Sequence, residues 1–301
     1  MPHSGLRTQH SALRVHAALF IVNFLFAVNY VVSKLGMSSF DPITFAYLRV
    51  LGAAIVMNAI LPRAAYAPLS RADWKRVALY SLLGVVINQS MFLAGLSLTS
   101  AHVAAILITA VPVFTLGAAM LFHEERVTAM KVGGIALACA GALAIVGGEG
   151  FDGTTKSLLG DLLIIGNSFA YAFYLVLSKP DMARLAPRRV IARMFAIAAV
   201  LMLPMAAVPM LRLPWRTIPA GAWWSLAFVI AGPTIAAYVL NAWALAHTDS
   251  SLVAAYTYLQ PVLTAVLAAM FLGEQIRAVA IAAGVLIFAG VWLAGRTAKI
   301  A

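Results

Sequence analysis

Apolar residues run along this chain in long blocks that short polar stretches separate. An α-helix needs about 20 predominantly apolar residues to cross the hydrocarbon core of a bilayer. The sequence therefore predicts an all-α membrane protein with ten transmembrane helices. Their approximate ranges are 14–34, 41–62, 75–98, 101–122, 128–147, 159–179, 190–210, 222–245, 251–272 and 278–295.

Capping residues mark three of the predicted helix starts. Asp41 supplies a side-chain acceptor and Pro42 a fixed φ, and both suit the first turn of the second helix. The hydroxyl groups of Thr128 and Ser251 suit the N-caps of the fifth and ninth helices.

The fourth and fifth predicted helices are repeated in the ninth and tenth. Pro112 and Glu125 stand 149 residues before Pro261 and Glu274, in similar apolar surroundings. Further identities at this offset pair Ala105, Val113, Thr115, Ala119, Ala129, Leu137, Ala140 and Gly141 with Ala254, Val262, Thr264, Ala268, Ala278, Leu286, Ala289 and Gly290. A fixed offset of half the chain indicates a duplicated domain.

The front of each half repeats more loosely. Three matches share an offset of 145, namely Val31, Ser33 and Lys34 with Val176, Ser178 and Lys179. At that offset Asn29 is the counterpart of Tyr174. Arg49 and Arg193 match at 144, which implies a one-residue shift in the preceding loop.

The repeat divides the chain into two domains of five helices each. The first is predicted at residues 1–147 and the second at 160–301, joined by a linker at 148–159 that is rich in Gly and Thr. Because five is odd, the second half must enter the membrane upside down relative to the first. Such an inverted repeat is typical of secondary transporters, whose substrate site lies near the midplane where the halves meet.

Composition and charge agree with a membrane protein. Of the 301 residues, 63% are hydrophobic and 10% charged, whereas a soluble domain has about a quarter charged. The net charge of +11 lies in short loops, which does not indicate a nucleic-acid partner. With the N-terminus in the cytoplasm, fifteen Lys and Arg lie on the inner side and five on the outer side. This bias predicts an inner (plasma) membrane protein with both termini cytoplasmic.

The sequence resembles a known family at the repeated stretch. The runs AAILITAVPVFTLGAAMLFHEERVTAMKVGGIALACAGALAI and VAAYTYLQPVLTAVLAAMFLGEQIRAVAIAAGVLIFAGVWLA are similar to the two halves of EamA-type members of the drug/metabolite transporter superfamily. The run FAVNYVVSKLG…FAYLR resembles that family's opening motif, with Phe26-Ala27 where Trp-Gly is usual. The resemblance implies transport of a small metabolite, and it contributes to placing the cavity among helices one, three, four, six, eight and nine.

Polar residues inside membrane spans are costly and are therefore candidates for function. We expect a cavity lined by amides and aromatic rings that binds a small neutral or zwitterionic substrate. The candidates are Asn29, Asn88, Gln89, His102, Asn167, Tyr171, Tyr174, Tyr238, Asn241, Trp243, Tyr256, Tyr258 and Gln260. The alternative for each is a structural role, as an interhelical hydrogen bond or an interfacial ring.

The repeated prolines and glutamates are candidates for helix kinks and gating. Pro112 and Pro261 deprive the carbonyls of Ile108 and Thr257 of their usual helical partners, which is expected at a cavity or at a static kink. Glu125 and Glu274 are expected either to cap the next helix of their own half or to act as gate charges.

The small residues of the fifth and tenth spans predict close helix packing. Gly133, Leu137 and Gly141 recur at a spacing of four, and Ala282, Leu286 and Gly290 repeat this spacing. Small residues at this spacing let helices approach closely in lipid. We expect each of these two spans to pack against its own half, with a dimer interface as the alternative.

Acidic residues are missing from the middle of every predicted span, which argues against a dedicated organic-cation antiporter. Lys34 and Arg49 lie toward span ends, where snorkelling to the interface explains them. No enzyme motif, metal site or cofactor motif is found.

Together these features predict a secondary transporter of small polar metabolites that works by alternating access, with export of amino acids or related compounds as the favoured activity. The alternatives are proton-coupled efflux of drugs or hydrophobic metabolites and a receptor or scaffold that does not transport.

Overall fold

A computed structural model describes residues 3–60, 68–99, 101–146, 155–272 and 278–296, and every regular element in these ranges is helical. The α-helices are α1 (His3–Gly36), α2 (Pro42–Ile60), α3 (Arg71–Ser81), α4 (Asn88–Leu98), α5 (Ala101–Leu107), α6 (Ala110–Leu121), α7 (Ala129–Val146), α8 (Thr155–Leu185), α9 (Pro187–Arg212), α10 (Ala220–Val229), α11 (Ala237–His247), α12 (Ser250–Ala255), α13 (Leu259–Leu272) and α14 (Ala278–Gly295). The π-helices η2 (Leu82–Ile87) and η4 (Ile230–Ala236) join α3 to α4 and α10 to α11, and two short 3₁₀ turns are η3 (Trp215–Thr217) and η5 (Tyr256–Tyr258).

These elements form ten helical rods at the ten predicted places, because several short helices continue one another. In the described residues seven rods are long and apolar enough to cross a membrane, and shorter apolar helices cover Ala129–Gly141 and Val285–Ala294. The prediction of an all-helical membrane protein with ten helices is confirmed.

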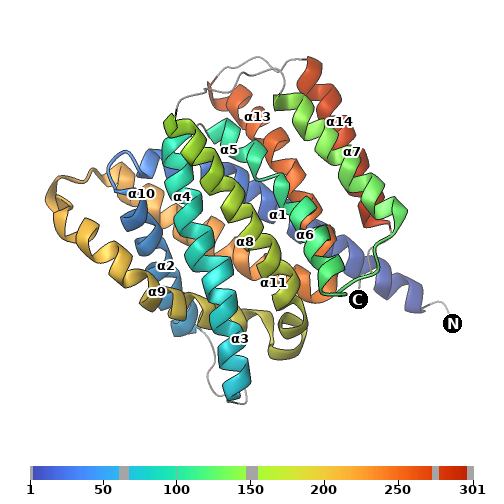
Figure 1. The fold of residues 1–301 in the computed structure, drawn as a ribbon, viewed down its shortest axis with the longest axis horizontal. Coiled ribbons are helices and arrows are strands. Elements are labelled where there is room, and N and C mark those ends of the chain that lie inside the picture. Colours follow the sequence, from blue (N-terminus) through green and yellow to red (C-terminus); the bar gives the residue numbers. More distant parts are fainter. Residues whose placement is uncertain (1–2, 61–67, 100, 147–154, 273–277, 297–301) are drawn as a thin grey trace.

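Equivalent rods of the two halves occupy equivalent places. In Figure 1, α7 and α14 lie side by side at one end of the molecule, and α2 and α9 lie together toward the other end. Between them α4 packs against α8, and the equivalent pair, α1 with α10 and α11, is also in contact. The central rods therefore come from both halves.

Departures from regular α-helix are repeated as well. The π-helix η2 starts at Leu82 and η4 starts at Ile230, close to one repeat length apart. The fourth rod breaks before α6 starts at Ala110, and the ninth breaks before α13 starts at Leu259, 149 residues later. Since π-turns and breaks cost regular hydrogen bonds, their recurrence indicates a site that both halves share.

Two of the three predicted caps are confirmed. Asp41 Oδ1 accepts the N–H groups of Ile43 at 2.9 Å and Thr44 at 3.1 Å. Thr128 Oγ1 accepts the N–H of Lys131 at 3.2 Å. The prediction for Ser251 is wrong, because Asp249 occupies the N-cap position of α12 and Ser251 lies inside the helix.

Close packing of α7 against α14 depends on two glycines. A Cβ on Gly134 would lie 2.7 Å from the carbonyl oxygen of Gly290, and one on Gly290 would lie 2.5 Å from that of Gly134. The prediction for the small residues is therefore corrected in two respects. The fifth and tenth rods pack against each other across the halves. The contacting residue is Gly134, since Gly133 is exposed and a Cβ added there would meet no heavy atom within 4 Å.

This packing predicts opposite effects for two adjacent glycines. Gly134→Ala should force α7 and α14 apart and destabilise the protein by about 1–3 kcal/mol, as overpacking does in a close-packed interior. Gly133→Ala, the matched control, should leave stability unchanged or raise it, because alanine favours helix by about 1 kcal/mol. Thermal melting of the two purified variants in detergent measures the difference. Equal melting temperatures would contradict the close approach.

Candidate functional site

A cavity of about 490 Å³, counted with the open space at its mouth, lies where the central rods of both halves meet. All six rods predicted to form it contribute, and α2 of the second rod joins them. The lining residues are Phe26, Asn29, Tyr30, Arg49, Asn88, Gln89, Phe92, Ile108, Val111, Asn167, Tyr171, Tyr238, Thr257 and Gln260.

Several lining residues are equivalent positions of the repeat. Four pairs line the cavity together, at offsets of 145 for the first and 149 for the others: Phe26 with Tyr171, Gln89 with Tyr238, Ile108 with Thr257, and Val111 with Gln260. The same face of each repeated rod therefore points inward. A shared cavity at the junction of the halves follows from the duplication.

The predicted cavity residues divide into two groups. Those that line the cavity are Asn29, Asn88, Gln89, Asn167, Tyr171, Tyr238 and Gln260. Those placed elsewhere are Tyr174, Asn241, Trp243, Tyr256 and Tyr258. The side chain of His102 lies outside the described residues.

Three of these other candidates form side-chain contacts, and one of the contacts reaches a lining residue. Asn241 donates from Nδ2 to the Tyr171 hydroxyl at 2.9 Å and so orients a lining residue from behind. Trp243 stacks near His247, with ring centroids 4.6 Å apart. Tyr256 bonds His16 through its hydroxyl at 2.6 Å.

The lining residues Phe26, Tyr30 and Phe92 were not predicted, although helical periodicity points to them. Phe26 and Tyr30 lie three residues before and one after Asn29, which places all three on one broad face of α1. Phe92 follows Asn88 by four residues on α4. A search of the positions three and four residues from each polar candidate, on the same helix face, would have identified Phe26 and Phe92.

Tyr238 connects the two halves at the cavity wall. Gln89 Nε2 donates to its hydroxyl at 2.6 Å, and this hydroxyl lies 3.0 Å from both the Gly84 carbonyl and Asn88 Oδ1 as possible acceptors. Asn88 Nδ2 in turn donates to Asn167 Oδ1 at 2.5 Å. Since Gln89 and Tyr238 are equivalent positions, the bond joins the two copies directly.

A second polar chain joins α1 to α13. The Tyr30 hydroxyl donates to Gln260 Oε1 at 2.8 Å, and Gln260 Nε2 donates to Asn23 Oδ1 at 2.8 Å. All three side chains are buried. Buried polar groups in a membrane interior are costly unless they are bonded within the protein, and this second chain meets that requirement. The first chain leaves Gln89 Oε1 and Asn167 Nδ2 without a partner among the described residues.

The explanation of Arg49 as a snorkelling residue is wrong. Its side chain is 1% exposed and lies in the cavity wall rather than at an interface. Nε donates to Thr234 Oγ1 at 3.0 Å, and Nη1 has no hydrogen-bond partner. Lys34, in contrast, is exposed near the end of α1, as snorkelling requires.

The two prolines follow the helix breaks at the cavity. Each is the third residue of its helix, Pro112 in α6 and Pro261 in α13, where a missing N–H breaks no internal bond. The Ile108 carbonyl lacks its usual partner, as predicted, since Pro112 has no N–H, and it accepts the N–H of Val111 at 3.0 Å instead. The break itself supplies that partner.

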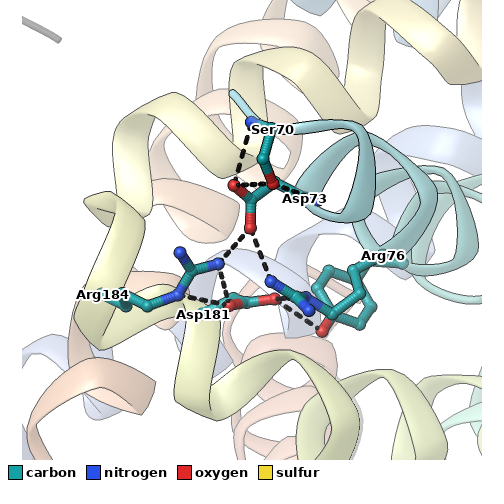
Figure 2. A network of polar contacts seen from close by, with 6 residues as sticks. Ser70, Asp73, Arg76, Asp181 and Arg184 are labelled. Atoms are coloured by element: carbon teal, nitrogen blue, oxygen red, sulfur yellow. Dashed lines mark hydrogen bonds and ion pairs between the residues drawn. The ribbon is translucent and has the colours of Figure 1, made fainter. Parts of the chain in front are cut away.

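A first cluster of ion pairs joins α3 to the end of α8, between residues of the two halves (Figure 2). Asp73 and Asp181 lie between the guanidinium groups of Arg76 and Arg184. Arg76 Nε approaches Asp181 Oδ2 to 2.7 Å, and the Tyr80 hydroxyl donates to the same oxygen at 2.9 Å. The Ser70 capping box at the start of α3 fixes Asp73.

A second cluster lies next to it and contains Glu125. The ammonium group of Lys131 pairs with Glu125 and lies 3.0 Å from Asp249 Oδ2. Glu125 Oε1 also accepts the N–H of Ser251 at 3.0 Å, within the first turn of α12. Glu125 therefore contacts both halves, because Lys131 belongs to α7 of its own half and Ser251 to α12 of the other. The expectation that Glu125 caps α7 is wrong, since Thr128 accepts the backbone N–H there. Glu274 lies outside the described residues.

Both clusters lie on the same face of the molecule. Lys179 of the second cluster and Asp181 of the first are two residues apart on α8, and Lys179 lies 3.3 Å from Glu124 and 3.5 Å from Asp249. We call this face the ion-pair face. The interactions across it connect the two halves below the cavity.

Comparison with known proteins identifies the family. The model of the EamA-like transporter family matches residues 13–147 and again residues 158–296. The chain belongs to this family. It is therefore a membrane transporter and not an enzyme.

Two relatives and one solved structure extend the EamA comparison. An uncharacterized transporter of Archaeoglobus fulgidus is 27% identical over 93% of this chain and 96% of its own. A probable terminal-alkyne amino-acid exporter of Streptantibioticus cattleyicolor is 27% identical over 86% of this chain and 83% of its own. A crystal structure with a TM-score of 0.71 covers 95% of this chain and 97% of its own, and at 19% identity it shows the fold alone.

The polar wall of this EamA cavity predicts a measurable role for one hydroxyl. Tyr238→Phe leaves Gln89 Nε2 without its 2.6 Å acceptor and should destabilise the protein by about 1 kcal/mol, the scale of a hydrogen bond between membrane helices. Tyr47→Phe removes a hydroxyl outside this network and is the control. Thermal melting in detergent should separate the two variants. Equal melting temperatures would mean that the hydrogen bond between Gln89 and Tyr238 does not contribute to the stability of the protein.

Proposed function

We propose that this EamA-family member exports small neutral or zwitterionic metabolites, amino acids or close relatives of them, across the cytoplasmic membrane by alternating access. The observation that supports this most is the cavity at the junction of the repeats. Amides and aromatic rings line it, and the described lining includes no carboxylate. Such a lining suits the polar groups and the apolar remainder of an amino acid better than an organic cation.

The proposed cycle requires the halves to separate on one face while they close on the other. The clusters of the ion-pair face are the contacts that must open, because they join α3 and the 123–131 segment to α8 and α12. The side chains of Arg76 and Arg184 are 45% and 49% exposed, so water can replace their partners at modest cost. The almost fully buried contacts of Lys131 with Asp249 and of Glu125 with Ser251 are costlier to separate and act as the stronger closure.

We propose that the ion-pair face is cytoplasmic. This follows if both termini are cytoplasmic and the halves, residues 1–147 and 160–301 with a linker at 148–159, form an inverted repeat. The excess of Lys and Arg in loops of that side supports this orientation. The structure then represents a state closed toward the cytoplasm.

The amino-acid class is supported by a relative as well as by the lining. The chain is similar over most of its length to a probable terminal-alkyne amino-acid exporter. The apolar side chain of such a substrate would contact rings such as Phe26 and Phe92, and its polar groups would reach the amides. The same chemistry suits other small metabolites that combine an apolar body with polar ends.

Counterflow in liposomes tests this proposal. Purified protein is reconstituted with a mixture of unlabelled neutral amino acids inside, and labelled ones are offered outside without any ion gradient. Accumulation above that of protein-free liposomes is expected. No accumulation of amino acids with or without a proton gradient would reject the substrate class, and gradient-dependent uptake of aromatic cations instead would favour drug efflux. A protein that moves neither would be a receptor or scaffold.

Opening of the ion-pair face is tested separately by cysteine labelling. The natural Cys139 is the single cysteine, so a Cys139→Ala background with Val111→Cys reports access to the cavity. Arg76→Gln removes one cation from the first cluster, and a loss of about 1 kcal/mol would raise the open population about fivefold. Labelling by an impermeant maleimide from the cytoplasmic side should rise accordingly.

Lys75→Gln is the matched control for this labelling. It removes a positive charge from the position of α3 just before Arg76, where the side chain is exposed and takes no part in either cluster. It should leave the labelling rate unchanged. Equal rates in the Arg76 and Lys75 variants would mean that the first cluster does not hold this face closed.

A further inference from the structure

Arg49 places one positive charge in the wall of the cavity without a counter-ion. It is the one charged side chain among the described residues of the lining, and it forms no ion pair with any described residue. A guanidinium group stays protonated in proteins, so the charge is present when the cavity is empty. Leaving it unpaired and almost fully buried costs several kcal/mol. We expect such a charge in a binding site when the bound ligand neutralises it.

The surrounding helix orients this guanidinium group. Pro233 in η4 has no N–H to give to the Val229 carbonyl, and the Thr234 hydroxyl donates to that carbonyl at 2.7 Å instead. The oxygen of Thr234 therefore has a lone pair free for Nε of Arg49, at 3.0 Å. With Nε held in this way, the other N–H donors of the planar guanidinium group remain for a ligand, including those of Nη1, which has no partner.

The chemistry of the missing partner follows from the group itself. Arginine can only donate, so its partner must be an acceptor, whereas the amides of Gln89 and Asn167 can present either an oxygen or an amino group. A carboxylate matches the guanidinium fork with two parallel hydrogen bonds and neutralises one charge. One cation in the described lining fits a group with a single negative charge, and a phosphate would carry more charge than this lining balances.

We propose that Arg49 binds the carboxylate of the transported substrate, so that the cavity accepts monocarboxylates, amino acids among them, and rejects the same molecules with the carboxyl group blocked. This inference rests on the proposed transport function and changes its substrate class, since it adds anionic monocarboxylates to the zwitterionic amino acids and leaves out neutral metabolites. The buried Gln89 Oε1, which also lacks a partner, is an acceptor on the same wall for the ammonium group of a zwitterion.

A purely structural role is the competing explanation. In that case Arg49 would only tie α2 to η4 through Thr234, and its charge would not matter. Three variants distinguish the binding role from the structural role. Arg49→Gln removes the charge, Arg49→Lys keeps the charge without the fork, and Thr234→Val removes the tie and keeps the guanidinium group.

The test uses four probes that differ only in their charged groups. They are phenylalanine, 3-phenylpropanoate, phenylalaninamide and 3-phenylpropanamide, with leucine, 4-methylpentanoate, leucinamide and 4-methylpentanamide as a parallel aliphatic set. Binding is measured as the shift in melting temperature of the detergent-purified protein, and transport as counterflow in liposomes. Binding does not require a transport cycle, so the two readouts can fail independently.

The wild-type protein should bind and transport the acids and should ignore the amides. Arg49→Gln should weaken binding of the acids about ten- to a hundredfold, the scale of losing charge-assisted hydrogen bonds, while its melting temperature without ligand should not fall, because the variant also loses an unpaired buried charge. Arg49→Lys should retain a weaker preference for acids. Thr234→Val should retain the preference with affinity lowered less than about tenfold, because it loses the hydrogen bonds that orient Arg49 and keeps the guanidinium group that binds the carboxylate.

Arg193→Gln is the matched control. Arg193 is the counterpart of Arg49 in the repeat, but it donates to Asn58 Oδ1 at 2.8 Å and does not line the cavity. This variant should bind and transport the acids as the wild type does, within about twofold. An equal loss in both arginine variants would assign the effect to folding and overturn the proposal.

The remaining outcomes distinguish the inference from the proposed function. Wild-type protein that binds or transports amides as well as acids overturns the role of Arg49 and leaves transport intact. Binding of acids that depends on Arg49, with no counterflow of any probe, supports the inference and contradicts transport. If no acid of either set raises the melting temperature or is transported, the inference is wrong.

Discussion

The bilayer interior offers no water to a free backbone group, and this constraint governs where the helices of this protein can be irregular. The two π-helices and the two helix breaks recur in equivalent rods, and residues at both breaks, Ile108 and Thr257, line the cavity. Each irregularity also has its compensation nearby. The Val111 N–H reaches the Ile108 carbonyl, and the Thr234 hydroxyl takes the place of the amide hydrogen that Pro233 lacks. The cavity therefore lies where other protein groups can form hydrogen bonds with the backbone carbonyls that the irregular helices leave free.

The sequence was sufficient for the rods and for their duplication, because both follow from local properties. Length and hydropathy set each span, and the 149-residue offset relates the breaks before α6 and α13 as well as the residues around them. Packing partners were harder to predict. Gly133 and Gly134 are both small and adjacent, and only the rotation of α7 against α14 determines which one is in contact. That rotation depends on the neighbouring rods and leaves no trace in the spacing of residues along one helix.

The candidate site was predictable to the extent that polarity alone marks it. Amides such as Asn88 and Gln89 stand out in an apolar span, and they do line the cavity. Phe26 and Phe92 were missed because an aromatic ring is unremarkable in a membrane helix. Arg49 was misinterpreted for a different reason: its distance from the start of α2 suits either snorkelling or burial, and the choice depends on which neighbour it meets. The contact of Glu125 with α12 was missed because Ser250 and Ser251 are about 125 residues away in sequence.

Duplication and divergence contribute differently to a transport cycle. Two similar halves give two related closures of the cavity, and divergence between the copies makes these closures unequal in energy. The pair Arg49 and Arg193 illustrates this difference, since one arginine lies unpaired in the cavity wall and its counterpart bonds Asn58 outside it. An uncompensated charge raises the free energy of the empty cavity, whereas a bound anion lowers it. A bound substrate therefore changes the relative free energies of the two states through Arg49. Because Arg49 also contacts η4 of the opposite half, substrate binding is connected to the relative position of the two halves.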